Sequence, residues 1–136
     1  MTADPHGELP PGFLAAGPDE PVVMLNLLRF ADGGRARYQQ YAKAFATTVA
    51  PHYGVEVVYA GDGDDALIAA AGQQWDAVLL VRYPTRRAFS QMIADPAYQR
   101  IAHLRREALR EAVLQPTRPW GRTPRHGDLP ERRPAG

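Results

Sequence analysis

Residues 21–30 read PVVMLNLLRF, a bounded and nearly continuous apolar run. A run of this length and composition predicts a β-strand. Successive side chains of a strand point to opposite faces, so the run divides into one row with Asn26 at its centre and another that ends in Arg29. Both rows are otherwise apolar, which predicts that neither face of this strand is covered by water alone.

The segment after this strand has the spacing of an amphipathic helix. Within residues 33–54, Tyr38, Tyr41 and Phe45 recur at intervals of three and four, and the pattern ends near Pro51. The tyrosines therefore lie on the inner face of the predicted helix. There they either fill the core or line a site for a small molecule.

The middle of the chain predicts two further strands and a turn. Residues 55–60 (VEVVYA) and 66–70 (ALIAA) read as two strands that the turn GDGDD joins, so the sequence predicts a hairpin over residues 55–70. Residues 75–83 read as the next strand, with Trp75 and Tyr83 at the two ends of one row. Tyr83 either completes the core or hydrogen-bonds at the mouth of a cavity.

Two helices and a short strand complete the pattern. Thr85 is a good N-cap for a short helix, and Asp95 followed by Pro96 begins another. A last strand is expected near residues 113–119. This order predicts an α+β fold of the ferredoxin-like, split βαβ type, an antiparallel sheet with helices on one face. The bare face would be covered by packing two sheets face to face in a homodimer.

Composition bounds the class of protein. The 136 residues suffice for one domain, which we place at residues 21–116 between a tail over 1–20 and a Pro- and Arg-rich tail over 117–136. The second tail is either a solvated extension or an arm that docks on a partner subunit through Trp120. A net charge of +1 predicts neither nucleic-acid nor membrane binding, and the chain has no cysteine. No signal-peptide pattern is present, so a cytoplasmic location is expected.

One cation interrupts an apolar stripe. In the stretch from Asp95 to Leu109, Tyr98, Ala102 and Ala108 fall on one side of a helix, and Arg105 falls among them. The guanidinium either reaches water along its aliphatic stem or pairs with a buried anion.

Three sources could supply that anion. Asp76, Glu56 or a backbone carbonyl would do so from within the chain. The alternative is a carboxylate, phenolate or enolate of a substrate.

Asn26 poses the same question on the first strand. Its amide must be hydrogen-bonded if it is buried, either to a neighbouring loop or to a ligand in a cavity. The four histidines do not have the spacing of metal ligands, and His103 projects roughly opposite Tyr98, so no metal site is expected.

Three segments resemble a known family. MLNLLRF with the two tyrosines after it, WDAVLLVRYPTRRAF and DPAYQRIAHLR resemble small bacterial domain-of-unknown-function proteins of the dimeric α/β-barrel superfamily, over about residues 21–115. The resemblance implies a dimer in which each subunit holds an apolar cavity between sheet and helices. It implies that Asn26, Trp75, Tyr83 and Arg105 are the polar or aromatic points of that cavity.

The characterised relatives in that superfamily suggest two kinds of enzyme. The first is a cyclase, isomerase or cofactor-independent monooxygenase for an aromatic or polyketide-like substrate, in which Arg105 stabilises an enolate or phenolate while Asn26 and Tyr83 orient the substrate. Tyr38, Tyr41, Tyr98 and Trp75 would contact that substrate. The second is a haem-degrading monooxygenase, because Asn26, Tyr83 and His103 match that branch's Asn, aromatic and His positions. A non-catalytic binding module is the third hypothesis.

Overall fold

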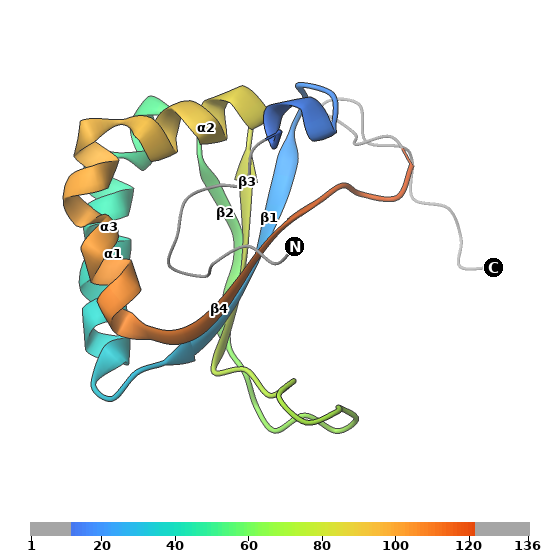
Figure 1. The fold of residues 1–136 in the computed structure, drawn as a ribbon, viewed down its shortest axis with the longest axis vertical. Helices are drawn as coiled ribbons and strands as arrows, with labels where there is room; N and C mark the ends of the chain where they lie inside the picture. Colours follow the sequence, from blue (N-terminus) through green and yellow to red (C-terminus); the bar gives the residue numbers. More distant parts are fainter. Residues whose placement is uncertain (1–11, 122–136) are drawn as a thin grey trace.

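The computed structural model describes residues 12–121, which form one antiparallel sheet with its helices on one face (Figure 1). The strands are β1 (Val22–Phe30), β2 (Glu56–Asp62), β3 (Ala77–Tyr83) and β4 (Leu109–Thr117). The helices are α1 (Gly34–Thr48), α2 (Arg86–Ala94) and α3 (Pro96–Ala108), with short 3-10 turns η1 (Leu14–Ala16) and η2 (Ala50–His52). The strand order is β2-β3-β1-β4. These features confirm the predicted ferredoxin-like α+β fold.

β1 is central to the sheet, and its two rows differ as the alternation predicts. Val22, Met24 and Leu28 of one row are almost completely buried and face the helices. Val23 and Leu25 of the other row are only partly buried, because no helix covers that side (Figure 1). We call the uncovered side of the sheet its open face.

The predicted hairpin over residues 55–70 is wrong. β2 pairs with β3, from Glu56 opposite Arg82 to Asp62 opposite Ala77, and residues 66–70 form no strand. They belong to a long connection, residues 63–76, that we call the β2–β3 loop. An apolar run of five residues after a turn fits a strand and a loop tip equally well, and only the partner strand decides between them.

The two helix starts of the second half are confirmed. The Thr85 hydroxyl accepts a hydrogen bond from the Ala88 N–H at the start of α2, and the Asp95 carboxylate accepts one from the Ala97 N–H at the start of α3. α3 ends at Ala108 and β4 begins at the next residue, so β4 starts earlier than the sequence predicts.

The packed chain begins before residue 21. The ring of Phe13 packs edge-on against Phe89 of α2, with centroids 5.5 Å apart, and its carbonyl accepts a hydrogen bond from Arg86. The main core lies between the helices and the helix-facing side of the sheet. Its fully buried side chains include Val22, Met24, Val49, Phe89 and Met92.

Candidate functional site

Six of the side chains singled out from the sequence lie together between the sheet and the helices. They come from four elements and are Asn26 of β1, Tyr38 and Tyr41 of α1, Tyr83 of β3, and Tyr98 and Arg105 of α3. We call this group the Arg105 cluster. Each residue lies in the helix-facing row of its strand or on the inner face of its helix, so the periodicity of the elements brings the group together.

Arg105 is half-buried and contacts a neutral oxygen. One of its terminal nitrogens donates to Oδ1 of Asn26 over 3.4 Å, near the outer limit of a hydrogen bond. The Asn26 amide nitrogen donates in turn to the carbonyl of Met24 over 3.3 Å. Asn26 is buried, so this pair of contacts fixes its amide with the oxygen toward the guanidinium.

No carboxylate of residues 12–121 forms an ion pair with Arg105. The side chain of Asp76 accepts a hydrogen bond from the backbone N–H of Phe30 over 2.8 Å. Glu56 is exposed and lies opposite Arg82 in the sheet register. Neither of the carboxylates considered from the sequence therefore neutralises the guanidinium.

The tyrosines surround this cation with neutral hydroxyl groups. The Tyr41 and Tyr98 hydroxyls are 3.2 Å apart and share a hydrogen bond. Burial raises the pKa of Tyr38, Tyr41 and Tyr83 above the usual value for tyrosine, and the nearby Arg105 charge acts in the opposite direction at all three. Burial dominates, so these phenols keep their protons at neutral pH.

The cluster is rich in donors and contains no obvious base. Arg105 donates only, and protonated tyrosines can also donate. Among the described residues, no carboxylate or imidazole hydrogen-bonds to a member of the cluster. A preorganised cation beside several hydroxyl groups binds anions and stabilises negative charge that develops on an oxygen atom.

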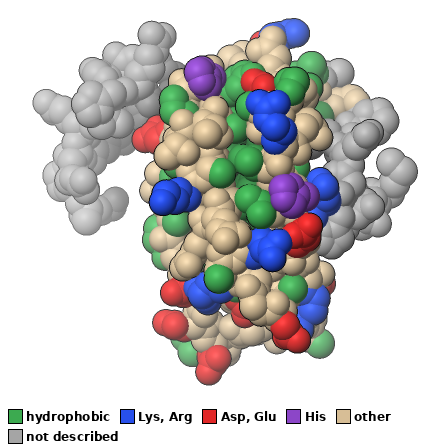
Figure 2. Space-filling view, turned by 90° about the vertical axis from the view of Figure 1, so that its left-hand side faces the viewer, with side chains coloured by type: hydrophobic (Ala, Val, Ile, Leu, Met, Phe, Trp, Pro, Cys, Tyr) green, Lys and Arg blue, Asp and Glu red, His purple; other side chains and the backbone are tan. Residues whose placement is uncertain are grey.

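The structure places two other predicted residues apart from the cluster. Trp75 lies two residues before β3, in the β2–β3 loop, and its ring lies against the guanidinium of Arg29, with 4.3 Å between Cζ of Arg29 and the ring centroid. His103 is exposed on the outer side of α3. Figure 2 shows that the outer surface of the helical layer mixes basic, acidic, histidine and apolar side chains, without a patch of one sign.

An aromatic contact next to the cluster was not predicted. The rings of Tyr83 and Phe89 meet edge to face at 4.8 Å, and Phe13 packs on the other side of Phe89. Phe89 and its helical spacing predict a core residue. Phe13 stands in a Pro-rich segment without periodicity, and nothing in its surroundings indicates that it reaches the core.

The described residues give no sign of two further kinds of site. No three His, Asp or Glu side chains within residues 12–121 come together in a way that could hold a metal ion. Within the same range, no helix has both the length and the apolar content needed to cross a membrane.

Comparison with solved structures supports the fold and identifies relatives. The RPA0582 protein of Rhodopseudomonas palustris is 29% identical, with 81% of this chain and 90% of that chain covered and a TM-score of 0.71. For a methylated form of RPA0582 the identity is 30%, the coverage 80% of this chain and 87% of that chain, and the TM-score 0.72.

More distant structures share the fold. A dimeric ferredoxin-like protein of Thermobifida fusca is 17% identical over 73% of this chain and 91% of its own, with a TM-score of 0.51. The hydroxynitrile lyase of Passiflora edulis is 12% identical over 74% of this chain and 94% of its own, with a TM-score of 0.57.

The family model gives the most direct assignment. A search of curated proteins found no match. The model of a domain of unknown function, DUF1330, matches residues 28–115, which include β1 from Leu28 onward and almost all of β4. This match covers more than half of the chain, and the protein therefore belongs to the DUF1330 family.

Proposed function

We propose that the protein is a homodimeric enzyme that acts on a small, largely apolar, aromatic or polyketide-like molecule. Arg105 binds the anionic oxygen of a phenolate or enolate, while Asn26 and Tyr83 orient the substrate. Cyclisation, isomerisation and cofactor-independent oxygenation are the reactions that such stabilisation favours. The distant neighbours share the fold alone, so the choice of chemistry rests on the residues of this chain.

The observation that carries this proposal is the guanidinium of Arg105. It is half-buried, and its hydrogen bond goes to the neutral Asn26 oxygen over 3.4 Å rather than to a carboxylate. A partly desolvated cation is stabilised most by an anion within hydrogen-bond distance. A substrate oxygen with negative charge would meet that requirement.

The protonated tyrosines restrict the class of substrate. Burial raises the pKa of Tyr41 and Tyr83, so neither phenol is a base at neutral pH. The substrate must therefore be acidic enough to lose its own proton on binding beside Arg105. Phenols and 1,3-dicarbonyl compounds meet this condition, and a tyrosine hydroxyl can donate to the oxygen on which charge develops.

Two observations support the dimer. Val23, Leu25, Leu27, Val78 and Leu80 give the open face an apolar centre that no helix covers. The ferredoxin-like relative from Thermobifida fusca is described as dimeric. A second copy packed face to face would remove this apolar surface from water.

A thermal-shift experiment tests the binding step. The probes are 1-hydroxy-2-naphthoate and its neutral amide, added in a concentration series to wild type and to Arg105→Ala. We expect the naphthoate to raise the melting temperature of wild type more than the amide does, since a ligand at 100 times its dissociation constant stabilises by about 2.7 kcal/mol. Arg105→Ala should abolish the difference between the probes. Arg106→Ala is the matched control, because Arg106 is exposed on the same helix.

Turnover separates the enzyme from a non-catalytic binding module. Phenolic and 1,3-dicarbonyl compounds that stabilise the protein would be incubated with wild type and Arg105→Ala, and consumption would be followed by chromatography. Consumption that requires Arg105 supports the proposed enzyme. Binding that requires Arg105, with no compound consumed, favours the binding module. Equal behaviour of the two proteins in both assays rejects the site.

A further inference from the structure

The β2–β3 loop is held in place by its own contacts and by neighbouring strands. The Gly63 N–H donates to the Asp76 carbonyl over 2.9 Å at the base of the loop. Within the loop, the Gln74 side chain accepts from the Ala66 N–H over 2.6 Å and donates to the Asp64 carbonyl over 2.9 Å. These bonds close the loop around its tip.

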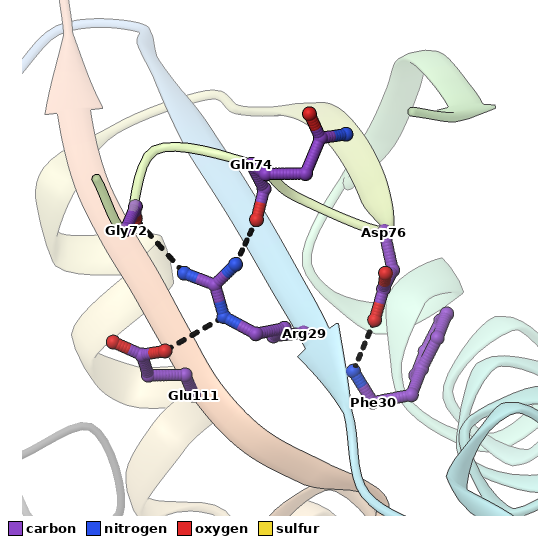
Figure 3. A network of polar contacts seen from close by, with 6 residues as sticks. All are labelled: Arg29, Phe30, Gly72, Gln74, Asp76 and Glu111. Atoms are coloured by element: carbon purple, nitrogen blue, oxygen red, sulfur yellow. Dashed lines mark hydrogen bonds and ion pairs between the residues drawn. The ribbon is translucent and has the colours of Figure 1, made fainter. Parts of the chain in front are cut away.

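Arg29 of β1 fastens the same loop to the sheet. Its guanidinium donates to the backbone carbonyls of Gly72 and Gln74 and to the carboxylate of Glu111 on β4, as Figure 3 shows. The ring of Trp75 lies against the guanidinium as well. Thus β1 supplies the arginine that holds the loop, and β4 supplies the carboxylate that pairs with this arginine.

The loop presents apolar side chains to solvent. Leu67 is 98% exposed and Ile68 is 97% exposed, although the loop that carries them is well fastened. Two large aliphatic side chains that are neighbours in the sequence and contact almost nothing within the chain are available for contact with another surface. Asp64 and Asp65 precede them, so the tip is both apolar and acidic.

A complementary surface lies at the far end of the same sheet. Leu114, within β4, is partly exposed, and beyond the end of the strand Trp120 is completely exposed, with the basic Arg118 between β4 and Trp120. In Figure 1 the β2–β3 loop and this end of β4 project to the side away from the helices, at opposite ends of the sheet. Both therefore reach beyond the open face.

The direction of the two-fold axis determines which ends of the two sheets lie together. If two open faces pack around an axis perpendicular to the strands, the loop of one copy and the end of β4 of the other lie at the same end of the paired sheets. An axis parallel to the strands would instead bring two acidic loops together, and like charges repel. The charges of Asp64, Asp65 and Arg118 thus favour the first arrangement.

We propose that the β2–β3 loop of each copy docks on the segment that follows β4, residues 118–120, of a second copy. Leu67 and Ile68 pack against Trp120, and the aspartates before them lie near Arg118. This inference rests on the dimer of the proposed function. It adds the contact that determines how the two copies are oriented. An anionic membrane surface is a poorer partner for the tip, because Asp64 and Asp65 would face charges of their own sign.

Disulfide trapping tests the contact directly, because the chain contains no cysteine. The double variant Leu67→Cys/Trp120→Cys is expected to form chains linked in pairs or larger species under mild oxidation, seen on a non-reducing gel and lost on reduction. Leu67→Cys alone and Trp120→Cys alone should remain unlinked. Gln40→Cys/Trp120→Cys is the matched control, since Gln40 is exposed on the helical side. All the replaced side chains are exposed, so folding should be preserved.

Each other outcome overturns the inference in a recognisable way. Efficient linking of Leu67→Cys alone means that loop meets loop, and linking of Trp120→Cys alone means that the β4 ends meet. A double variant that is dimeric by light scattering but stays unlinked shows that the loop docks elsewhere. A wild-type protein that is monomeric rejects the dimer itself, whereas the Arg105 binding assay is read independently of both.

A second variant removes the contact without introducing thiols. Leu67→Ser/Ile68→Ser is expected to raise the dissociation constant of the dimer by about tenfold or more, measured by sedimentation velocity over a dilution series. An unchanged dissociation constant would overturn the proposed docking while leaving the dimer intact.

Discussion

At the scale of single residues, the buried tyrosines couple stability to alkaline pH. Burial raises the pKa of Tyr38, Tyr41 and Tyr83 above the usual tyrosine value of about 10, so the unfolded chain releases these protons at lower pH than the folded chain does. The contribution of these tyrosines to the free energy of unfolding is fully present below about pH 10, and it is lost as the pH rises toward their pKa values in the folded protein.

We therefore expect the free energy of unfolding to fall steeply above about pH 10. The check is a pH series that follows tyrosinate absorbance and circular dichroism together. Tyrosinate from the buried residues should form only as the native signal disappears. Full ionisation of all tyrosines in a protein with native circular dichroism would contradict this expectation.

Asn26 offers a second test at this scale. Asn26→Asp places a carboxylate of nearly the same shape next to the Arg105 guanidinium, where the Asn26 oxygen now lies 3.4 Å away. The new ion pair should supply the missing counter-charge, so the affinity for 1-hydroxy-2-naphthoate should fall about tenfold or more in the folded variant, although the aspartate cannot donate to the Met24 carbonyl as the Asn26 amide does. Undiminished affinity in the folded variant would show that the anion binds elsewhere.

The sequence was informative about the site where a polar residue interrupted an apolar row. Asn26 in its strand and Arg105 in its helix were both visible in this way, and the structure brings them into contact. The family resemblance implies that Trp75 belongs to the same group, and the predicted strand places it in one row with Tyr83, whereas β3 begins only at Ala77. The hydrogen-bond partner of a polar side chain depends on how distant elements pack together. The spacing of residues within one element does not determine this packing.

At the scale of elements, one glycine allows the start of α1 to lie close to the end of α3. Gly34, the first residue of α1, lies against the Ala108 carbonyl where α3 ends, and a Cβ atom at Gly34 would overlap that oxygen. The same carbonyl accepts a hydrogen bond from the Ala31 N–H over 2.9 Å, so it has little freedom to move.

Gly34→Ala should therefore destabilise the fold by about 1–3 kcal/mol. Gly33→Ala is the control. Its φ of 68° strains any other residue, but nothing lies within 4 Å of a Cβ atom there. Chemical denaturation of both variants should rank Gly34→Ala as the more damaging. The reverse order would mean that backbone strain outweighs the contact with Ala108.

The sequence predicts elements whose ends are marked by neighbouring residues, such as capped helices. It does not predict elements that depend on pairing with a strand far away in the sequence. The caps at Thr85 and Asp95 lie where the sequence put them, because each cap bonds to residues within three positions of itself. The strand proposed for residues 66–70 does not form, because β2 pairs with β3 instead. The helical period also continued past Ala108, and no proline or glycine marks the point where α3 becomes β4.

At the scale of the whole molecule, the open face should control association. Leu27 lies on that face, opposite Val78 of β3 and Val113 of β4. Leu27→Arg would place a charge in the centre of the proposed interface, where it has no partner. We expect a monomer by size-exclusion chromatography with light scattering. Gln39→Arg adds the same charge to the helical side and should leave the dimer intact; equal masses for the two variants would mean that the open face is not the interface.

Because α3 and β4 join directly, a movement of the helix is passed on to the strand. Arg105 lies in the last turn of α3, and Leu109 begins the edge strand with no intervening residue to absorb a movement. A movement of α3 would therefore be passed to β4, so that the proposed ligand beside Arg105 and the proposed second subunit would influence each other. Because thermodynamic coupling is reciprocal, a ligand that shifts α3 changes the strength of association by the same factor by which association changes its own affinity.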